Sequence, residues 1–261
     1  MICPYCHRGS GRQDGFSLAG TQMFECPRCL RKFCAKTQVG TFRKMRTDPR
    51  HIVLALTLIT RFKMTYREAA ALLYEVYRVR RTHVAILFWV HRYGPRLRRL
   101  LRVYKVRFSR RWHADALEMK VHGKKAYLWV ARDSRHRMVE ATMTRRKNAE
   151  ATTRFFRNAR RKAARMPRQV VMDKCPSLRK GKKIVLPRAR FVHGHIGGRI
   201  TNAMCEGYFG GNLRTNVERR RGFKRFGAAN RYLQVYQVLE NLRYQTVRPF
   251  HEALLSLLRS L

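Results

Sequence analysis

The sequence is poor in acidic residues. It holds 15 Asp and Glu against 59 Lys and Arg, which gives a formal net charge of +44 at pH 7. Such an excess of one sign repels itself unless a polyanion or salt screens it. Ribosomal and membrane-surface proteins are also very basic, but they seldom combine that charge with 45% hydrophobic residues in periodic segments. We therefore expect a nucleic acid as the partner, bound tightly at low salt and weakly at high salt.

The sequence also lacks long apolar runs and an even set of cysteines. No stretch approaches the roughly 18 uninterrupted apolar residues that a membrane-spanning helix needs, and no basic and apolar leader precedes Cys3. Seven cysteines are an odd number for a disulfide scaffold, and four of them form two Cys-x-x-Cys pairs. This usage indicates a reducing compartment and metal ligation. We expect a soluble protein that stays inside the cell and makes no membrane contact.

The paired cysteines lie in residues 1–36 and predict a zinc ribbon. Cys3 and Cys6 form one pair, Cys26 and Cys29 the other, and a polar, Gly-rich segment separates them. Tetrahedral Zn²⁺ takes four such ligands, and each tight turn supplies two thiolates. A segment this short buries little apolar surface, so the metal would stabilise its fold. A redox pair is the alternative, and further ligand candidates are His7 and Cys34.

Three short helices are predicted over residues 48–95. Asp48-Pro49 begins the first helix, Thr65 and Glu68 form a capping box for the second, and Thr82 caps a third that ends at Gly94. This order suits a helix-turn-helix whose last helix enters the major groove of DNA, although a generic three-helix unit has the same periodicity. A basic linker follows over residues 96–111. The expected apolar face of the third helix comprises Val84, Leu87, Phe88 and Val90. The expected DNA contacts of this region are Arg80, Arg81, Thr82 and His83.

The chain beyond residue 111 predicts an α/β domain. Strand-like runs cover 112–121, 125–132 and 137–144, a helical segment covers 149–164, and the short apolar run 169–172 is typical of a buried parallel strand. A meander, a crossover helix and a further strand give a mixed sheet with helices on its faces. A weaker strand is expected around Phe191-Val192, and helices from about Asn202, the last of them over 228–243.

Because acids are scarce, each can be weighed individually. Asp115 lies within the first strand of the meander, and Asp173 directly follows the run after the crossover helix. In the predicted sheet these strands are neighbours, so both carboxylates fall at one edge. Phosphoryl transfer with two metal ions needs carboxylates that converge in this way. The alternative for each Asp is a turn or a helix cap.

Several of these residues resemble the catalytic core of insertion-sequence transposases of the IS-six group and its archaeal relatives. The resemblance is carried by Trp112-His113-Ala114-Asp115, by the strand 126–133 and by Val171-Met172-Asp173-Lys174, and Thr65 to Ala70 is similar to the helix-turn-helix of that group. It covers about residues 50–245. The Ala116-Leu117 pair departs from the Glu-Thr that commonly follows the first acid of the family.

The resemblance implies a third acid on a helix, followed by a basic residue and a Gly-Phe-Lys signature. Glu206 fits this position, with Asn202 before it, Ala203 in place of a second Asn, and Gly222-Phe223-Lys224 downstream. Glu218 is the rival, but it lies in a basic cluster that favours surface ion pairs. The implied metal ligands for Mg²⁺ or Mn²⁺ are therefore Asp115, Asp173 and Glu206. Further DNA contacts are expected from Arg214, Lys224 and Arg225.

These patterns together predict a DNA transposase. Its expected regions are the zinc ribbon, the helix-turn-helix, the linker, a ribonuclease-H-like catalytic domain over 112–247 and a C-terminal helical tail over 248–261. The resemblance implies double-stranded DNA, both element ends and target, as partner, a homodimer or larger assembly on DNA, and a cytoplasmic, nucleoid-associated protein of a prokaryote. The alternatives are a non-catalytic DNA-binding regulator derived from a transposase and an RNA-associated zinc-ribbon protein.

Overall fold

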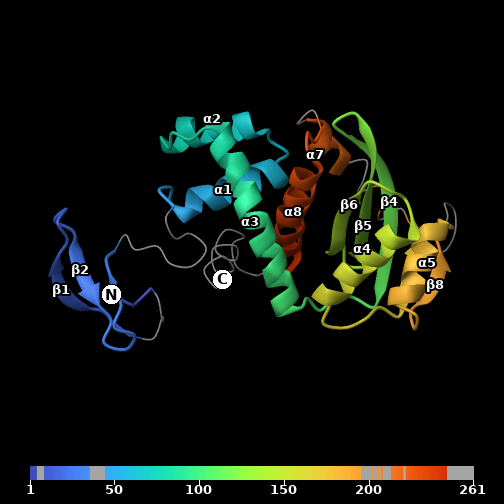
Figure 1. Cartoon of the computed structure of the whole chain (residues 1–261), viewed down its shortest axis with the longest axis horizontal. Coiled ribbons are helices and arrows are strands. Elements are labelled where there is room, and N and C mark those ends of the chain that lie inside the picture. Colours follow the sequence, from blue (N-terminus) through green and yellow to red (C-terminus); the bar gives the residue numbers. More distant parts are fainter. Residues whose placement is uncertain are drawn as a thin grey trace.

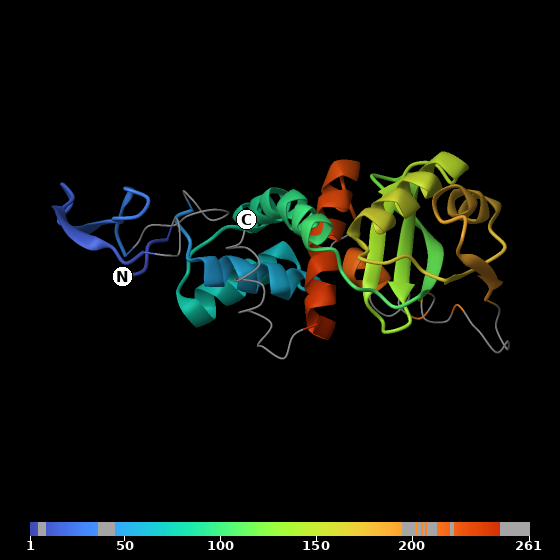
Figure 2. The ribbon, with the colours of Figure 1, turned by 90° about the horizontal axis from the view of Figure 1, so that it is seen from below.

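A computed structural model describes residues 1–4, 9–35, 45–194, 202, 205, 207, 213–219 and 222–245. A small sheet lies near the N-terminus, a group of helices follows, and a larger sheet covered by helices forms the other end (Figure 1). The same three parts lie in a row when the molecule is turned by 90° (Figure 2). Over the described ranges, no helix combines the length and apolar character needed to cross a bilayer.

The N-terminal sheet is antiparallel and contains β1 (Arg12–Phe16), β2 (Gln22–Glu25) and β3 (Lys32–Phe33) in that order. Its core is small: Cys3, Cys26 and Phe33 are buried, and the ring of Phe24 stacks on Phe33 at 5.8 Å between centroids. So few apolar side chains contribute little stability on their own. A ligand that ties the cysteines together would therefore matter for this part of the chain.

Helices α1 (Pro49–Thr60) and α2 (Tyr66–Tyr77) begin where the sequence predicts. The Asp48 carboxylate accepts a hydrogen bond from the Arg50 amide at 2.7 Å, with Pro49 in the first turn. At α2, the Thr65 hydroxyl accepts from the Glu68 amide and the Glu68 carboxylate accepts from the Thr65 amide, so the predicted capping box is confirmed. At the N-terminus of each helix, the capping side chain thereby binds a backbone amide that has no partner within the helix.

Helix α3 (His83–Tyr104) is longer than predicted. Thr82 caps its start as expected, but the helix passes through Gly94 and Pro95 and includes residues 96–104 of the predicted linker. The expected end at Gly94 was therefore wrong. A Cβ at Gly94 would lie 2.6 Å from the Arg231 carbonyl oxygen, so this glycine serves the close approach of another helix rather than a helix end.

The predicted apolar face of α3 is also corrected. Val84 and Phe88 are more than half exposed, whereas the buried side of the helix includes Ile86, Trp89 and Val90. Trp89, the largest of these side chains, belongs to the core that also contains buried residues of α1 and α2, so the side of α3 that carries Trp89 faces inward. Val84 and Phe88 then face outward.

The large sheet has the strand order β6-β5-β4-β7-β8. Strands β4 (Arg111–Val121), β5 (Lys124–Asp133) and β6 (Met138–Thr144) form the antiparallel meander, while β7 (Gln169–Met172) pairs parallel with β4 and β8 (Arg190–His193) parallel with β7. Helix α4 (Ala149–Lys162) is the crossover between β6 and β7. The expected α/β class with a mixed sheet is confirmed.

Helix α5 (Pro176–Val185) was not predicted from the sequence. It lies beside α4, and the two helices cover one face of the sheet (Figure 1). The core between this face and the helices contains Trp112 and Trp129 of the sheet and Phe155 of α4. A Cβ at Gly181 of α5 would lie 2.4 Å from the Thr152 hydroxyl oxygen of α4. The absence of a side chain at Gly181 is thus what allows the two helices to touch.

Helix α8 (Phe226–Gln245) covers the other face of the large sheet and lies along the edge strand β6. Asn230, Gln237 and Asn241 lie seven and four residues apart and hydrogen-bond to backbone groups of Met138, Val139 and Met143 at 2.7–3.3 Å. An uncovered edge strand would leave these groups available to another chain. The amides of α8 thus act as an additional partner for the edge.

The opposite side of α8 packs against α3, and one continuous core joins α1 to α3, α8 and a face of the large sheet. Tyr93 and Leu97 of α3 belong to it with Tyr232 and Leu239 of α8, while Leu128 and Val130 come from the sheet. The helices predicted as a separate region and the predicted catalytic region therefore share one core.

Candidate active site and metal centre

Asp115 and Asp173 come from adjacent parallel strands. The pairing of β4 with β7 matches His113 to Val171, and each aspartate lies two residues further along its own segment. Strand β7 ends at Met172, so Asp173 directly follows it, and the register continued by two residues brings Asp115 beside Asp173. The charges of both acids act on the buried Cys205 thiol, so both lie near it. Both side chains are half-buried, and the Asp115 carboxylate accepts a hydrogen bond from the Ala116 amide at 2.7 Å. Two carboxylates thus lie close together at the point where β7 ends beside β4.

Asn202 and Cys205 attach a later segment to β4 directly before Asp115. The Asn202 side-chain amide donates to the Ala114 carbonyl at 3.4 Å, and the Cys205 thiol donates to the His113 carbonyl at 3.3 Å. Both side chains are at most 1% exposed. Gly194 makes room for this contact, since a Cβ there would lie 2.8 Å from Val171 Cγ1 and 3.0 Å from the Asn202 amide nitrogen.

The Cys205 thiol is held in its neutral form. Burial raises its pKa strongly and the negative charge of Asp115 raises it further, Arg132 lowers it in part, and the charge of Asp173 adds a smaller increase. A neutral thiol is a poor nucleophile and a poor metal ligand. Cys205 therefore packs beside the carboxylates as a neutral thiol. The hydrogen bond of Cys205 to β4 could not be predicted from the sequence, because it joins residues far apart in the chain.

The predicted third acid, Glu206, lies outside the described residues. Its rival Glu218 is on the short helix α7 (Thr215–Glu218), where its side chain is 66% exposed and lies 3.9 Å from the Arg214 guanidinium. This is the surface ion pair that the basic surroundings of Glu218 favoured. Glu206 directly follows the buried Cys205 in the sequence, and its role as the third acid stays a prediction.

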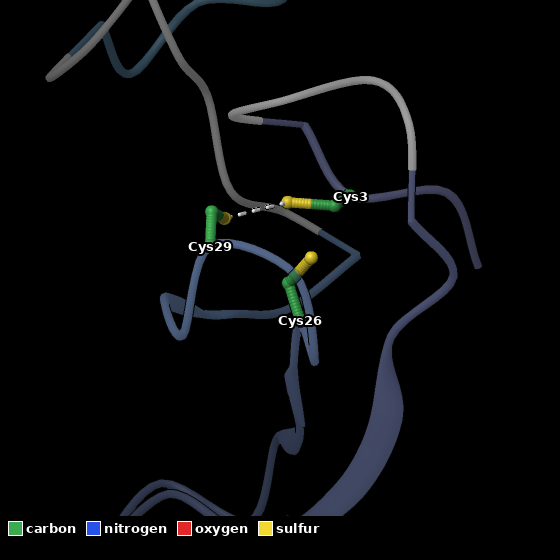
Figure 3. Close-up of side chains that lie close together, drawn as sticks. All are labelled: Cys3, Cys26 and Cys29. Atoms are coloured by element: carbon green, nitrogen blue, oxygen red, sulfur yellow. Dashed lines mark hydrogen bonds between the residues drawn. The ribbon is translucent and has the colours of Figure 1, made fainter.

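Three of the four predicted zinc ligands converge (Figure 3). The sulfur atoms of Cys3, Cys26 and Cys29 all lie within 4.8 Å of one another, and those of Cys3 and Cys29 are 3.6 Å apart. Zn–S bonds of about 2.3 Å in a tetrahedron place the sulfurs about 3.8 Å apart, so the arrangement fits Zn²⁺. A Cβ at Gly9 would lie 2.9 Å from the Cys26 sulfur. Small size at Gly9 thus keeps the site open.

The remaining ligand candidates do not join these three sulfur atoms among the described residues. Cys6 and His7 lie outside the described residues, and Cys34 is described but does not belong to the converging group. None of the described cysteines forms a disulfide. The thiols of the converging group are therefore available for metal ligation.

The residues predicted to contact DNA near α3 have different surroundings. Arg80 and His83 are exposed. Arg81 instead donates to the Thr47 hydroxyl at 2.6 Å, and the Thr82 hydroxyl accepts from the Ala85 amide as the helix cap. Arg81 and Thr82 therefore hold the start of α3 in place, while their two neighbours face solvent. The predicted contacts Arg214, Lys224 and Arg225 are exposed as well.

Comparison with known proteins assigns the class. The family model of the DDE domain of IS240-type transposases matches residues 109–246, which contain the whole large sheet and both aspartates. The chain therefore belongs to this DDE family. The resemblance to the IS-six group of transposases is confirmed.

Individual relatives are distant. The transposases for insertion sequence-like element IS431mec from Staphylococcus aureus strains Mu50 and N315 are each 23% identical over 136 residues, which cover 52% of this chain and 60% of the relative. The chain thus matches three fifths of the length of these curated relatives.

Solved structures also show similarity. A simian T-cell lymphotropic virus intasome in complex with PP2A regulatory subunit B56 gamma matches 56% of this chain and 52% of its own, with 12% identity and a TM-score of 0.40. The HTLV-2 integrase catalytic core domain in complex with magnesium matches 52% of this chain and 87% of its own, with 13% identity and a TM-score of 0.37.

Proposed function

We propose that this protein is a DNA transposase that binds the terminal inverted repeats of its insertion sequence and catalyses metal-dependent strand cleavage and strand transfer. The observation that carries the proposal is that Asp115 and Asp173 each lie two residues beyond the paired His113 and Val171 of adjacent parallel strands, inside the matched DDE domain. In this proposal residues 112–247 form a ribonuclease-H-like catalytic domain, and Asp115, Asp173 and Glu206 hold Mg²⁺ or Mn²⁺. Such hard cations prefer carboxylate oxygens.

The side chains around the aspartates would position these ligands. A pair of divalent ions, when bound, activates the attacking oxygen and stabilises the leaving oxygen of a phosphoryl transfer. Asp115 is fixed by its strand, and the bonds of Asn202 and Cys205 to β4 hold the chain that leads into Glu206. Because the Cys205 thiol stays neutral, it adds no further negative charge beside the carboxylates.

End recognition is assigned to residues 1–36 as a zinc ribbon and to 48–95 as a helix-turn-helix. The converging cysteines support the first assignment, with Cys6 as the fourth ligand, and the capped start of α3 supports the second. Exposed Arg80 and His83 would contact DNA directly. Phosphate contacts would come from Arg214, Lys224 and Arg225, and the protein would act as a homodimer or larger assembly on the DNA.

The decisive variant is Asp173→Asn. It removes a negative charge and keeps the shape of the side chain, so metal-dependent cleavage and joining should be lost while binding of end-containing DNA remains. Glu118→Gln is the matched control, because Glu118 lies on the same strand as Asp115 but its side chain is 56% exposed and pairs with Lys125. Cleavage is measured on labelled duplexes that carry the element end, and binding is measured on the same duplexes.

Two outcomes would overturn the assignment. Unimpaired joining by Asp173→Asn would exclude this carboxylate from the active site. An unmodified protein that binds element ends but never nicks them in Mg²⁺ or Mn²⁺ would instead support a non-catalytic regulator derived from a transposase.

A further inference from the structure

The outer surface of α4 and α5 is almost entirely cationic. After the first turn of α4, each exposed position is an arginine, and the exposed polar positions of α5 are all basic. The only acid in the two helices is Glu150, which pairs with Arg154 at 2.9 Å. We call this the α4–α5 surface; it comprises Arg154, Arg157, Arg160, Arg161, Arg179, Lys180 and Lys183.

The two helices form one rigid layer. The Thr152 hydroxyl of α4 donates to the Ser177 carbonyl at the start of α5 at 2.6 Å, and Gly181 packs directly on Thr152. The inner sides of both helices are buried in the same core, with Phe155 from α4 and Leu178 from α5. Arg179 is held over the Phe191 ring at 5.1 Å. The positive charges are therefore fixed on a firm base rather than on a loop.

This surface lies on the face of the sheet away from the aspartates. Along β4, Trp112 and Ala114 point to the core under α4 and α5, whereas Leu117 packs with the core of α8 and Cys205. Side chains alternate along a strand, so Asp115 is on the side of Leu117. A nucleic acid bound to α4 and α5 therefore lies on the opposite face of the sheet from a nucleic acid strand bound at the two aspartates of the same molecule.

We propose that the α4–α5 surface is a second DNA-binding site, which holds a duplex through its phosphates without reading its sequence. This step rests on the proposed function: the chain belongs to a family of transposase domains, and DNA is therefore the polyanion that we expect here. A helix with side chains is about 10–12 Å wide, so two helices side by side are roughly 20 Å wide. The major groove is only about 12 Å wide, and the layer therefore cannot enter it and contacts the backbone alone.

The test removes four of these charges with Arg157→Gln, Arg160→Gln, Lys180→Gln and Lys183→Gln. Glutamine keeps helix propensity close to that of the replaced residues. Binding of an arbitrary duplex of about 30 base pairs, or about three helical turns, is followed by fluorescence anisotropy over a series of salt concentrations. The slope of log K against log salt is negative, and each lost phosphate contact reduces its magnitude by about 0.9, so the magnitude is expected to fall by about 3 to 4.

Two control variants separate a site from net charge alone. Exchanging the same four residues between Arg and Lys keeps the charge and should keep the slope. Gln at Lys120, Lys124, Arg110 and Arg135, which are exposed elsewhere, removes an equal charge and should change the slope by less than half as much. Equal slopes for both Gln variants, or an unchanged slope for the α4–α5 variant, would overturn the proposal, as would a stronger effect on duplex RNA than on DNA.

The binding test needs neither catalysis nor element ends, so its failure is distinct from failure of the transposase assignment. Cleavage of a short end-containing duplex at saturating protein should stay within about twofold in the four-fold Gln variant, because a tenfold loss would cost about 1.4 kcal/mol of transition-state stabilisation that this surface is not placed to supply. If that variant does not fold, the two Gln substitutions on α4 and the two on α5 are made in separate variants. Each should reduce the magnitude of the slope by about 1.8.

Discussion

Lys162 and Glu140 form a buried ion pair between α4 and β6. The Lys162 ammonium lies 2.5 Å from one Glu140 oxygen and donates to Gln237 of α8 at 2.6 Å, and the Thr142 hydroxyl donates to the other Glu140 oxygen. Burial lowers the pKa of Lys162 to about 8, and the Glu140 charge opposes this effect. Burying two charges costs their hydration energy, and the attraction between them offsets this cost only when further hydrogen bonds satisfy both groups. Here they also fix α4 and α8 to the same strand.

Removing one partner should therefore be costly. Lys162→Met leaves the Glu140 charge buried and unpaired, and we expect a loss of about 3–5 kcal/mol in the free energy of unfolding. The double variant Lys162→Met/Glu140→Gln should recover most of this loss, since no uncompensated charge remains. Urea unfolding followed by circular dichroism measures both. If Lys162→Met alone were as stable as the unmodified protein, the Glu140 carboxylate would have to reach solvent in that variant.

This pair could not be predicted from the sequence. Glu140 and Lys162 are far apart in the chain, and each has basic or polar residues nearby that make it look like a surface charge. Only the packing of α4 on the meander buries them together. Asp115 and Asp173 differ, because a strand pattern precedes each of them, and the strand order alone brings them to one edge.

Gly94 controls how closely two helices meet. It lies in the interior of α3, where a glycine costs about 1 kcal/mol relative to alanine, but a Cβ there would collide with the backbone of α8. The contact thus offsets an unfavourable local preference. The Gly94 example shows why composition misled the prediction: a glycine that permits helix packing and a glycine that ends a helix look the same in sequence.

Gly94→Ala is expected to destabilise the protein by about 1–3 kcal/mol, as overpacking does in a well-packed interior. Gly227→Ala is the matched control, since a Cβ at Gly227 in the first turn of α8 meets nothing within 4 Å. That exchange should be neutral or stabilising by up to about 1 kcal/mol. Thermal unfolding of the two variants distinguishes them; equal midpoints would remove the proposed role of Gly94.

The strands were easier to predict than the helices. The run 169–172 coincides with β7, and the meander strands agree within one residue or so, because alternation and turn residues mark both ends. Helix α5 was missed because its Pro176 and three closely spaced lysines resemble a basic loop, and its apolar side shows only once it meets α4.

At the scale of the whole molecule, the N-terminal sheet has a core of its own. Cys3, Cys26 and Phe33 form a cluster separate from the two large cores. If zinc binds there, its removal should unfold this sheet and leave the rest intact. A chelator should release one zinc per chain and weaken binding of element ends, while the main unfolding transition stays unchanged. Loss of both transitions together would show that the sheet supports the whole fold.

The position of α8 between α3 and the large sheet has a further consequence. The matched DDE domain begins at residue 109, yet a fragment cut there would lose the α3 residues Tyr93 and Leu97 and leave one side of α8 bare. The family boundary is thus not a boundary at which the chain can be divided. The shared core also holds α1 to α3 against the part of the molecule that carries the aspartates. Under the proposed function, this packing, and not a flexible tether, sets the distance between the DNA sequence that the helices recognise and the bond that is cleaved.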